Sequence, residues 1–349
     1  MSGLALLTPF APPSVRGNAI TVERVARGLR ERGANLNVWD LSRTAEADVE
    51  RGVEAYRPAL VHAFHARRAG PAGLRLARRL EVPLIVTLTG TDANHDLLDA
   101  AHAALVRRVL EGAAAITAFH ASIVEGVAAV LPDVRTRLVV VPQSVAFASD
   151  VPVDLAARWR LPPDRVLFLF PAGIRPVKGP RTPLGPLDAL AAADPRVRLA
   201  YAGPILDGAE GAAWQRALAA RPWARHLGEV PHAEMASLLR QADVVLNCSV
   251  SEGGLANSVL EALTLERAVL ASDIPGNRGL VVDGVTGLLF RGGRELAAQA
   301  ARLVRDAALR ERLGRAGRAL VAREYPPERE VDGYLEVYRG LVPILSALR

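Results

Sequence analysis

The chain has a single cysteine, Cys248, among its 349 residues. One cysteine cannot form an internal disulfide, and its position in an apolar run predicts a small buried core residue. The lack of a disulfide framework favours a reducing compartment, so we expect a cytoplasmic protein. The first residues, Met1 to Pro9, lack the basic and long apolar segments of a signal peptide, and no apolar run reaches membrane-spanning length, so we expect neither feature.

Aromatic residues make up only 5% of the chain, too few for the stacking platforms of a single-strand nucleic-acid binder. Basic residues number 43 against 37 acidic ones, and the sequence pI is about 10.1. Such an excess suits nucleic acid, an anionic membrane surface or anionic small ligands. The densest basic groups, 75–79 and 302–318, recur at helical spacing, which predicts solvated helix faces. We therefore expect no nucleic-acid partner. A steep salt dependence of DNA or RNA binding would contradict this expectation. Peripheral contact with an anionic membrane stays open.

No G-x-G-x-x-G motif occurs, which disfavours a dinucleotide cofactor. Strand-like apolar runs instead alternate with helical segments in two series, a pattern typical of doubly wound parallel sheets. The first series has runs at 4–8, 36–41, 60–64, 84–88, 113–118 and 138–141, and the second has runs at 166–170, 197–202, 243–249, 268–272 and 287–290.

The length of the chain also allows two hydrophobic cores. We therefore predict an α/β protein with one domain at 1–145 and a second at 146–326, connected through the proline-bearing segment 142–163. Residues 327–349 are predicted to hold a C-terminal helix, Glu328 to Leu348, that crosses back over the first domain.

The segment 249–263, S-V-S-E-G-G-L-A-N-S-V-L-E-A-L, follows a strand-like run and opens a helical one. A turn of this kind lies at the carboxyl edge of a parallel sheet, where the N–H groups and dipole of the helix start favour an anion. Glu252 and Glu261 flank the turn, and carboxylates beside bound phosphate suit the hydroxyls of a nucleotide sugar. The alternative is a capping box from Ser258 to Glu261, in which Glu261 only satisfies its own helix start.

The segment 171–179, P-A-G-I-R-P-V-K-G, follows the first strand of the second predicted domain. It places Arg175 and Lys178 three residues apart, and an arginine fork with a lysine point charge can clamp a diphosphate. Such cations also neutralise the negative charge that grows on a departing nucleoside diphosphate. The alternative is a pair of surface cations in a turn.

These two segments, with A-G-P at 202–204 and G-E-V at 228–230, resemble the second domain of family 4 retaining glycosyltransferases of the GT-B fold, which contain a glycosyltransferase group 1 domain. The likeness covers nearly the whole chain through R-G-N-A-I-T at 16–21, H-A-F-H-A-R-R at 62–68, L-T-G-T-D at 88–92, V-P-Q-S at 141–144 and I-P-G-N at 274–277. The resemblance implies two Rossmann-like domains that face each other across a cleft.

The resemblance also implies roles for individual residues. Arg175 and Lys178 match the cationic pair on the donor diphosphate, Glu252 the carboxylate near the donor sugar, and Glu261 the carboxylate on the donor ribose. The other donor-binding residues that it implies are Gly17, Asn18, Gly173, Gly253, Gly254, Leu255, Ala256, Asn257 and Ser258.

The chain departs from the family pattern at two places. Eight residues separate Glu252 from Glu261, one more than is usual, and Thr89 stands where many relatives have a histidine. Asp92 then becomes the leading catalytic candidate of the first domain, positioning an acceptor hydroxyl. The remaining acceptor-side candidates are His62, His65, Thr89 and His120. These histidines lack metal-ligand spacing, so we expect no metal and no further cofactor.

The resemblance implies a metal-independent, retaining transferase that moves a hexosyl or N-acetylhexosaminyl group from a nucleoside-diphosphate sugar, expected to be a UDP-sugar, to an acceptor that the motifs do not identify. A sugar-nucleotide epimerase or phosphorylase of the same fold is one alternative, and product analysis with donor alone separates it. A non-catalytic nucleotide-sugar-binding protein is another. The first-domain motifs also resemble selenosugar synthases, whose acceptor is selenophosphate. Oligomeric state is not predicted.

Overall fold

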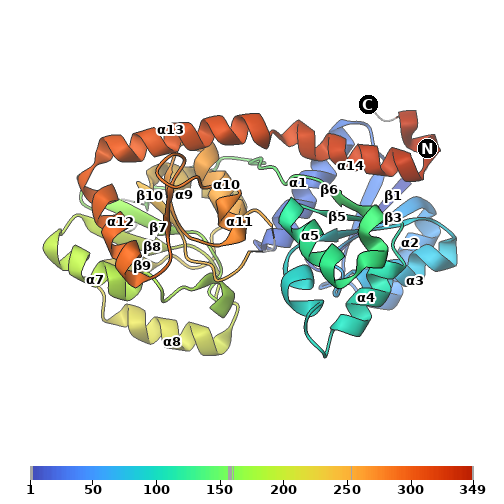
Figure 1. The fold of residues 1–349 in the computed structure, drawn as a ribbon, viewed down its shortest axis with the longest axis horizontal. Coiled ribbons are helices and arrows are strands. Elements are labelled where there is room, and N and C mark those ends of the chain that lie inside the picture. The colour runs from blue at the N-terminus through green and yellow to red at the C-terminus, as the bar shows by residue number, and fades with distance from the viewer. Residues whose placement is uncertain (1–2, 156–158, 160, 253, 348–349) are drawn as a thin grey trace. The chain divides into compact units, whose positions relative to one another are not determined.

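The computed structural model describes residues 3–155, 159, 161–252 and 254–347. The chain divides into two compact units, unit 1 with Met1–Ser144 and Tyr325–Arg349, and unit 2 with Val145–Glu324. Each unit contains a six-stranded parallel sheet with helices on both faces (Figure 1). The α/β class predicted from the two alternating series is therefore confirmed.

Unit 1 has the strand order β2-β1-β3-β4-β5-β6. Its strands are β1 (Gly3–Thr8), β2 (Leu36–Asp40), β3 (Pro58–Phe64), β4 (Leu84–Leu88), β5 (Ala115–Ala118) and β6 (Leu138–Val140). Its helices are α1 (Gly17–Glu31), α2 (Glu46–Tyr56), α3 (Gly70–Leu80), α4 (Ala103–Glu111), α5 (Ala121–Val130) and α14 (Pro327–Leu341), with short turns η1 (Asp92–Asp96), η2 (Pro132–Arg137) and η4 (Pro343–Ala347).

Unit 2 has the strand order β12-β11-β10-β7-β8-β9. Its strands are β7 (Val166–Phe170), β8 (Val197–Tyr201), β9 (Ala224–His226), β10 (Val244–Asn247), β11 (Ala268–Ser272) and β12 (Leu288–Phe290). Its helices are α7 (Leu184–Ala193), α8 (Gly208–Ala219), α9 (His232–Gln241), α10 (Asn257–Thr264), α11 (Pro275–Arg278), α12 (Gly293–Arg305) and α13 (Ala307–Glu324), with one short turn, η3 (Pro176–Lys178).

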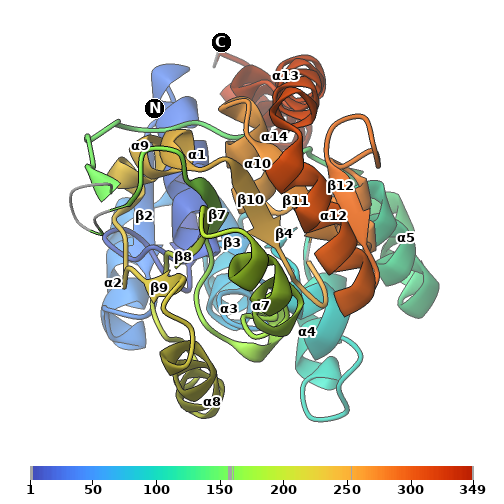
Figure 2. The same ribbon diagram turned by 90° about the vertical axis from the view of Figure 1, so that its left-hand side faces the viewer.

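The central strands are nearly continuous apolar runs because both faces of each sheet are covered. In unit 1, α2, α3, α4 and α5 pack on one face, and α1 and α14 pack on the other. In unit 2, α7, α8, α12 and α13 pack on one face, with α7 beside α12 (Figure 2). Helical residues therefore bury their apolar sides on the sheets, and the loops at the carboxyl edges stay available for ligands.

The strand orders reverse at one point in each sheet. In unit 1, β1 has β2 on one side and β3 on the other. In unit 2, β7 has β8 on one side and β10 on the other. Open parallel sheets bind ligands at the carboxyl ends of the strands that flank such a reversal. The loops after β1 and β3, and those after β7 and β10, are thus the natural ligand positions.

Helix α14 belongs to unit 1, where it packs beside α1. Arg24 of α1 donates to both carboxylate oxygens of Glu330 at 2.7 and 2.9 Å, and both side chains are buried. The predicted continuous helix from Glu328 to Leu348 is wrong in length, because Pro343 follows the helix end at Leu341 and begins a separate short turn. Leu348 itself lies outside the described residues.

The sequence also missed β9, whose three residues include Arg225 and His226 and form an edge strand without an apolar run.

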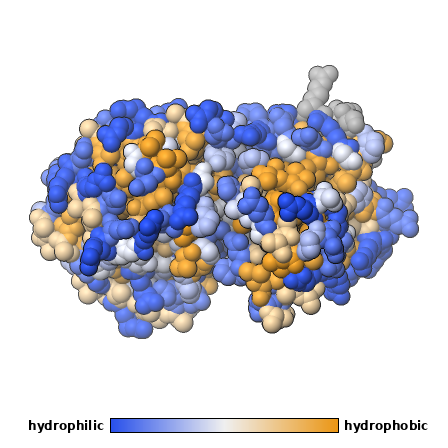
Figure 3. Space-filling view, in the orientation of Figure 1, coloured by the Kyte–Doolittle hydropathy of each residue, from blue (hydrophilic) through white to orange (hydrophobic). Residues whose placement is uncertain are grey.

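The basic helix faces lie in solvent as predicted. Arg75 and Arg79 of α3 are about half exposed and pair with glutamates of α2. Hydrophilic residues are spread over the visible face of both units (Figure 3). Within the part of the chain that the structure describes, no helix is long and apolar enough to cross a membrane.

Candidate active site

The two predicted donor segments follow β7 and β10, the strands that flank the reversal in unit 2. After β7 the chain passes half-buried Gly173 and reaches Arg175, the residue that precedes η3, and Lys178, its last residue. Gly179 then takes a left-handed φ of 59°, and a Cβ there would lie 2.4 Å from the carbonyl oxygen of Cys248. Only glycine fits this position, so the Lys178 segment packs directly against the end of β10.

Lys178 and Glu252 form an ion pair between these two segments. Lys178 Nζ donates to Glu252 Oε1 at 2.5 Å, and the same oxygen accepts from Ser249 Oγ at 2.5 Å and Asn247 Nδ2 at 3.2 Å. Burial alone would raise the pKa of Glu252, but the charge of Lys178 and these hydrogen bonds outweigh it and hold the pKa below its usual range. The Glu252 carboxylate is therefore ionised at neutral pH.

The glycine-bearing turn leads into α10 as the sequence predicts, but the helix starts differently from a capping box. Residues 254–256 are buried, while Asn257 and Ser258 are half-buried at the helix start. The residue before the helix is Ala256, which has no side chain that can cap it, so the capping-box alternative for Ser258 is wrong. Gly253 lies outside the described residues.

Glu261 lies inside α10 and has a partner that the sequence analysis missed. Its Oε1 lies 2.9 Å from Nε2 of His232, the first residue of α9, and Glu261 is only 5% exposed. The His232 ring in turn stacks on Phe147. The L-G-E-V-P-H segment gave no signal for this contact, because 29 residues separate the two side chains.

Asn277 is a second support that the sequence analysis did not assign. It is fully buried in α11, and its Nδ2 donates to Asn247 Oδ1 at 3.2 Å and to Ser272 O at 3.0 Å. Asn247 also donates to Glu252, so this amide network connects α11 to the Lys178–Glu252 pair. Its members come from strand ends that the sequence alone does not bring together.

Among the acceptor-side candidates of unit 1, His62 is a core residue. Its Nδ1 lies 2.7 Å from the Tyr338 hydroxyl and its Nε2 lies 2.6 Å from Thr87 Oγ1, and the ring is fully buried. Burial lowers the pKa of His62 to about 3, so the ring is neutral. The prediction that His62 faces an acceptor is therefore wrong.

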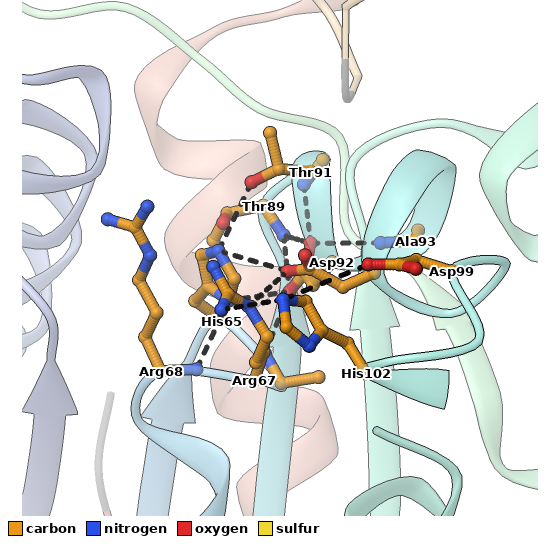
Figure 4. A network of polar contacts seen from close by, with 12 residues as sticks. His65, Arg67, Arg68, Thr89, Thr91, Asp92, Ala93, Asp99 and His102 are labelled. Atoms are coloured by element: carbon orange, nitrogen blue, oxygen red, sulfur yellow. Dashed lines mark hydrogen bonds and ion pairs between the residues drawn. The ribbon is translucent and has the colours of Figure 1, made fainter. Parts of the chain in front are cut away.

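Asp92 is also fully buried, at the centre of the network in Figure 4. Its carboxylate accepts backbone N–H groups from Ala66 at 2.8 Å, Thr89 at 3.0 Å, Gly90 at 2.7 Å and Ala93 at 3.2 Å. A carboxylate occupied by four backbone donors fixes the loops after β3 and β4. The geometry therefore does not support the predicted contact of Asp92 with an acceptor hydroxyl.

His65 belongs to the same network. Its Nδ1 lies 3.7 Å from Asp92 Oδ2 and its Nε2 lies 3.1 Å from Thr91 Oγ1. Burial lowers the pKa of His65 despite the opposing charge of Asp92. The backbone φ of His65 is +86°, a strained value that costs about 1–3 kcal/mol and is found mostly at functional sites.

The remaining candidates lie at helix and strand ends of unit 1. His120 precedes α5, and its Nδ1 accepts from Ser122 N at 3.2 Å, which makes it a helix cap. Thr89 is half-buried after β4, and its hydroxyl oxygen is buried without a hydrogen-bond partner among the described residues, so it stays an acceptor-side candidate. Gly17 and Asn18 begin α1 next to the loop after β1.

The structure thus brings Lys178 and Glu252 into contact and places Arg175 on the segment that carries Lys178. It separates the buried His62, Asp92 and His65 from direct ligand roles. Among the described ranges, no group of three or more His, Cys, Asp or Glu side chains is arranged to hold a metal ion.

Comparison with known proteins agrees with this architecture. Residues 154–320 match the family model "Glycosyl transferases group 1", and residues 5–144 match "Glycosyl transferase 4-like domain". Glycosyltransferase 1 domain-containing protein 1 from Xenopus tropicalis is 26% identical over 326 residues, which cover 91% of this chain and 92% of that protein.

Solved structures share the fold over nearly the full length. Sucrose-phosphate synthase from Thermosynechococcus elongatus superposes with a TM-score of 0.82 at 18% identity, covering 99% of this chain and 100% of that one. HepE from Anabaena in complex with UDP-glucose gives a TM-score of 0.77 at 16% identity, covering 97% and 100%. The chain is a glycosyltransferase and belongs to the glycosyl transferases group 1 family, with the two α/β units of the GT-B fold.

Proposed function

We propose that this enzyme transfers a hexosyl or N-acetylhexosaminyl group from a UDP-sugar to an acceptor with retention of configuration and without a metal ion. The observation that carries the proposal is the Lys178–Glu252 pair, at 2.5 Å, on the two strand ends that flank the reversal of the unit 2 sheet. A half-buried lysine beside a glycine turn and a helix start is suited to a diphosphate. HepE, whose fold is similar, binds UDP-glucose, which supports the choice of base.

The ammonium group of Lys178 has three N–H donors, so it can keep Glu252 through one of them and bind a diphosphate oxygen through another. Arg175, on the same segment, adds a second cation. The bond between the anomeric carbon and the diphosphate then breaks, and the two cations stabilise the charge on the leaving group. The acceptor oxygen bonds to the same face of that carbon, and its proton passes to the leaving phosphate oxygen.

Glu261 is assigned to the donor ribose. Its Oε1 lies 2.9 Å from His232 Nε2, and the residue is buried, with 5% of its surface exposed. A carboxylate has two oxygens, and each can accept from one of the vicinal hydroxyls of a ribose. His232 is then a positioning residue for Glu261, not a group that touches the reacting atoms.

The test is a panel of UDP-, GDP-, ADP- and TDP-sugars in which release of the nucleoside diphosphate is followed with and without EDTA. We expect UDP release from a UDP-hexose or UDP-N-acetylhexosamine that EDTA does not reduce, and a product whose anomeric NMR signal keeps the donor configuration. Release from another base only would overturn the donor assignment. If EDTA abolished UDP release and added Mg²⁺ restored it, the proposed metal independence would be overturned.

A further inference from the structure

The I-P-G-N segment at 274–277 leads from β11 into the short helix α11, which packs against the turn that carries Glu252. A Cβ at Gly276 would lie 2.6 Å from the Cβ of Glu252 and 2.6 Å from the carbonyl oxygen of Gly254. Only a glycine allows this approach, so the α11 backbone bears directly on Glu252. Asn277, the next residue of α11, is fully buried.

The side-chain amide of Asn277 has its orientation fixed by a backbone carbonyl. Its Nδ2 donates to Ser272 O at 3.0 Å, and this oxygen can only accept. The same Nδ2 lies 3.2 Å from Ser272 Oγ, which donates to Ser249 O at 2.6 Å and can therefore accept from the amide. If the amide were turned over, its Oδ1 would face the carbonyl oxygen, one acceptor against another. The NH₂ group of Asn277 is therefore the part that faces these oxygens.

This NH₂ group in turn fixes the amide of Asn247. It donates to Asn247 Oδ1 at 3.2 Å, and that oxygen also accepts from Ser249 N at 3.0 Å. With two donors on its oxygen, Asn247 has one favourable orientation, in which its own NH₂ group donates to Glu252 Oε1 at 3.2 Å. The hydrogen bonds thus run in one direction, from Asn277 through Asn247 to the carboxylate that accepts from Lys178 at 2.5 Å.

Packing alone does not account for an asparagine at position 277. Its Oδ1 is buried without a hydrogen-bond partner among the residues that the structure describes. A buried acceptor of this kind costs stability, and an apolar side chain of similar shape would avoid that cost. What the amide provides is its NH₂ group, which orients Asn247.

We propose that Asn277 is a positioning residue for the transfer reaction, acting through Asn247 to hold the Glu252 carboxylate and, with it, the Lys178 ammonium in the orientation that turnover needs. A group that acts on a reacting bond loses much of its effect when it is displaced by a fraction of an ångström, so a supporting amide can control rate without touching the substrate. The effect on turnover rests on the proposed function, whereas the effect of Asn277 on Glu252 rests only on contacts within unit 2.

The test compares the full-length wild type with Asn277→Leu, Asn277→Ala and the control Thr286→Val. Leucine keeps a branched side chain without either polar atom, so the site can be tested even if the cavity left by alanine prevents folding. Thr286 is also buried, and its hydroxyl donates to Leu280 O at 2.9 Å and accepts from Val282 N at 2.8 Å. The control therefore removes a buried polar group from the same connection between β11 and β12, and urea unfolding shows that each protein is folded under the assay conditions.

Turnover is measured as UDP release from UDP-glucose, in these proteins and in the same position 277 variants made in a Glu252→Gln background. We expect kcat of the position 277 variants to fall by about tenfold or more while KM for UDP-glucose changes by less than about twofold, because the misplaced groups act on the breaking bond. In the Glu252→Gln background the same substitutions should change the residual kcat by less than about twofold, since the carboxylate that they position is already gone. Thr286→Val should keep the kcat of the wild type.

Crystal structures of the same proteins give a readout that needs no turnover. In Asn277→Leu the Glu252 carboxylate should leave its contact with Asn247 or take more than one orientation, and in Thr286→Val it should stay in place. An unmoved Glu252, an equal loss of kcat in Thr286→Val, or equal losses in both Glu252 backgrounds would overturn the positioning role. If Glu252 moves in Asn277→Leu but no nucleotide sugar releases a nucleoside diphosphate from the wild type, Asn277 still positions Glu252 and the proposed function fails.

Discussion

The contact between Lys178 and Glu252 gives Lys178 a possible role in stability as well as in catalysis, and the two roles can be measured separately. Lys178→Ala leaves a buried carboxylate without its cation, so we expect the free energy of unfolding to fall by about 2 kcal/mol. Loss of charge stabilisation on the leaving diphosphate should lower kcat by about 100-fold or more. Urea unfolding and initial rates of UDP release measure the two effects.

The double variant Lys178→Ala/Glu252→Gln decides between the two roles. A glutamine at 252 still accepts from Ser249 and Asn247 but needs no cation, so most of the lost stability should return. Turnover should stay low, because the diphosphate still lacks its lysine. Recovery of turnover together with stability would make Lys178 a structural residue.

Single residues show where sequence reasoning reaches its limit. Lys178 and Glu252 were both predicted for the donor site, yet their contact joins positions 74 residues apart, which no local pattern encodes. His62 is the opposite case. A histidine near a strand end is a plausible acceptor ligand by sequence, but in the fold it is covered by Tyr338, which lies 276 residues later in the chain. Residue type and strand position therefore predict candidates, and long-range packing decides which of them meet a ligand.

The turn after η3, which packs against the end of β10, depends on one glycine, Gly179. In Gly179→Ala a Cβ would meet the carbonyl oxygen of Cys248 at 2.4 Å and the left-handed φ would be strained, so Lys178 should shift. We expect kcat/KM to fall at least tenfold and the unfolding free energy to fall by about 2 kcal/mol. Gly185→Ala, in α7 with nothing within 4 Å of its Cβ, is the matched control and should be neutral or stabilising by up to about 1 kcal/mol. Equal behaviour of the two variants would show that the turn tolerates a side chain.

Elements with strong apolar runs were predicted, and elements without them were not. The runs at 166–170 and 268–272 coincide with β7 and β11, because both faces of these strands are buried. β9 is short and half polar, so only pairing with β8 makes it a strand. Helix α10 starts at Asn257, ahead of Ser258, and the turn before it packs against α11 so tightly that a Cβ at Gly276 would lie 2.6 Å from Gly254 O.

For the whole chain, the two alternating series predicted two parallel sheets, but they carried no information on strand order. That order places the loops after β7 and β10 together, and the loops after β1 and β3 together, and so creates both ligand positions. Helix α14 packs on unit 1 through its own apolar contacts, and its Tyr338 covers His62. Protonation of the buried His62 ring is therefore coupled to the stability of unit 1.

Unfolding of the chain should consequently be sensitive to mild acid. His62 has a folded pKa of about 3, below the ordinary value of 6.5, so between these pH values the unfolded chain binds a proton that the folded chain excludes. Stability therefore falls as pH falls through this window, by about 2 kcal/mol between pH 7 and pH 5 for this residue. Urea unfolding of the wild type and His62→Gln at both pH values measures it, and the variant should lack this part of the loss.

Tyr338→Phe separates this titration from simple loss of packing. It removes the hydroxyl that lies 2.7 Å from His62 Nδ1 but keeps the histidine buried under α14. The unfolding free energy should drop by about 1 kcal/mol at both pH values, and the loss between pH 7 and pH 5 should match that of the wild type. If His62→Gln loses as much stability on acidification as the wild type does, protons are being taken up elsewhere, and His62 is not the group that makes the fold acid-sensitive.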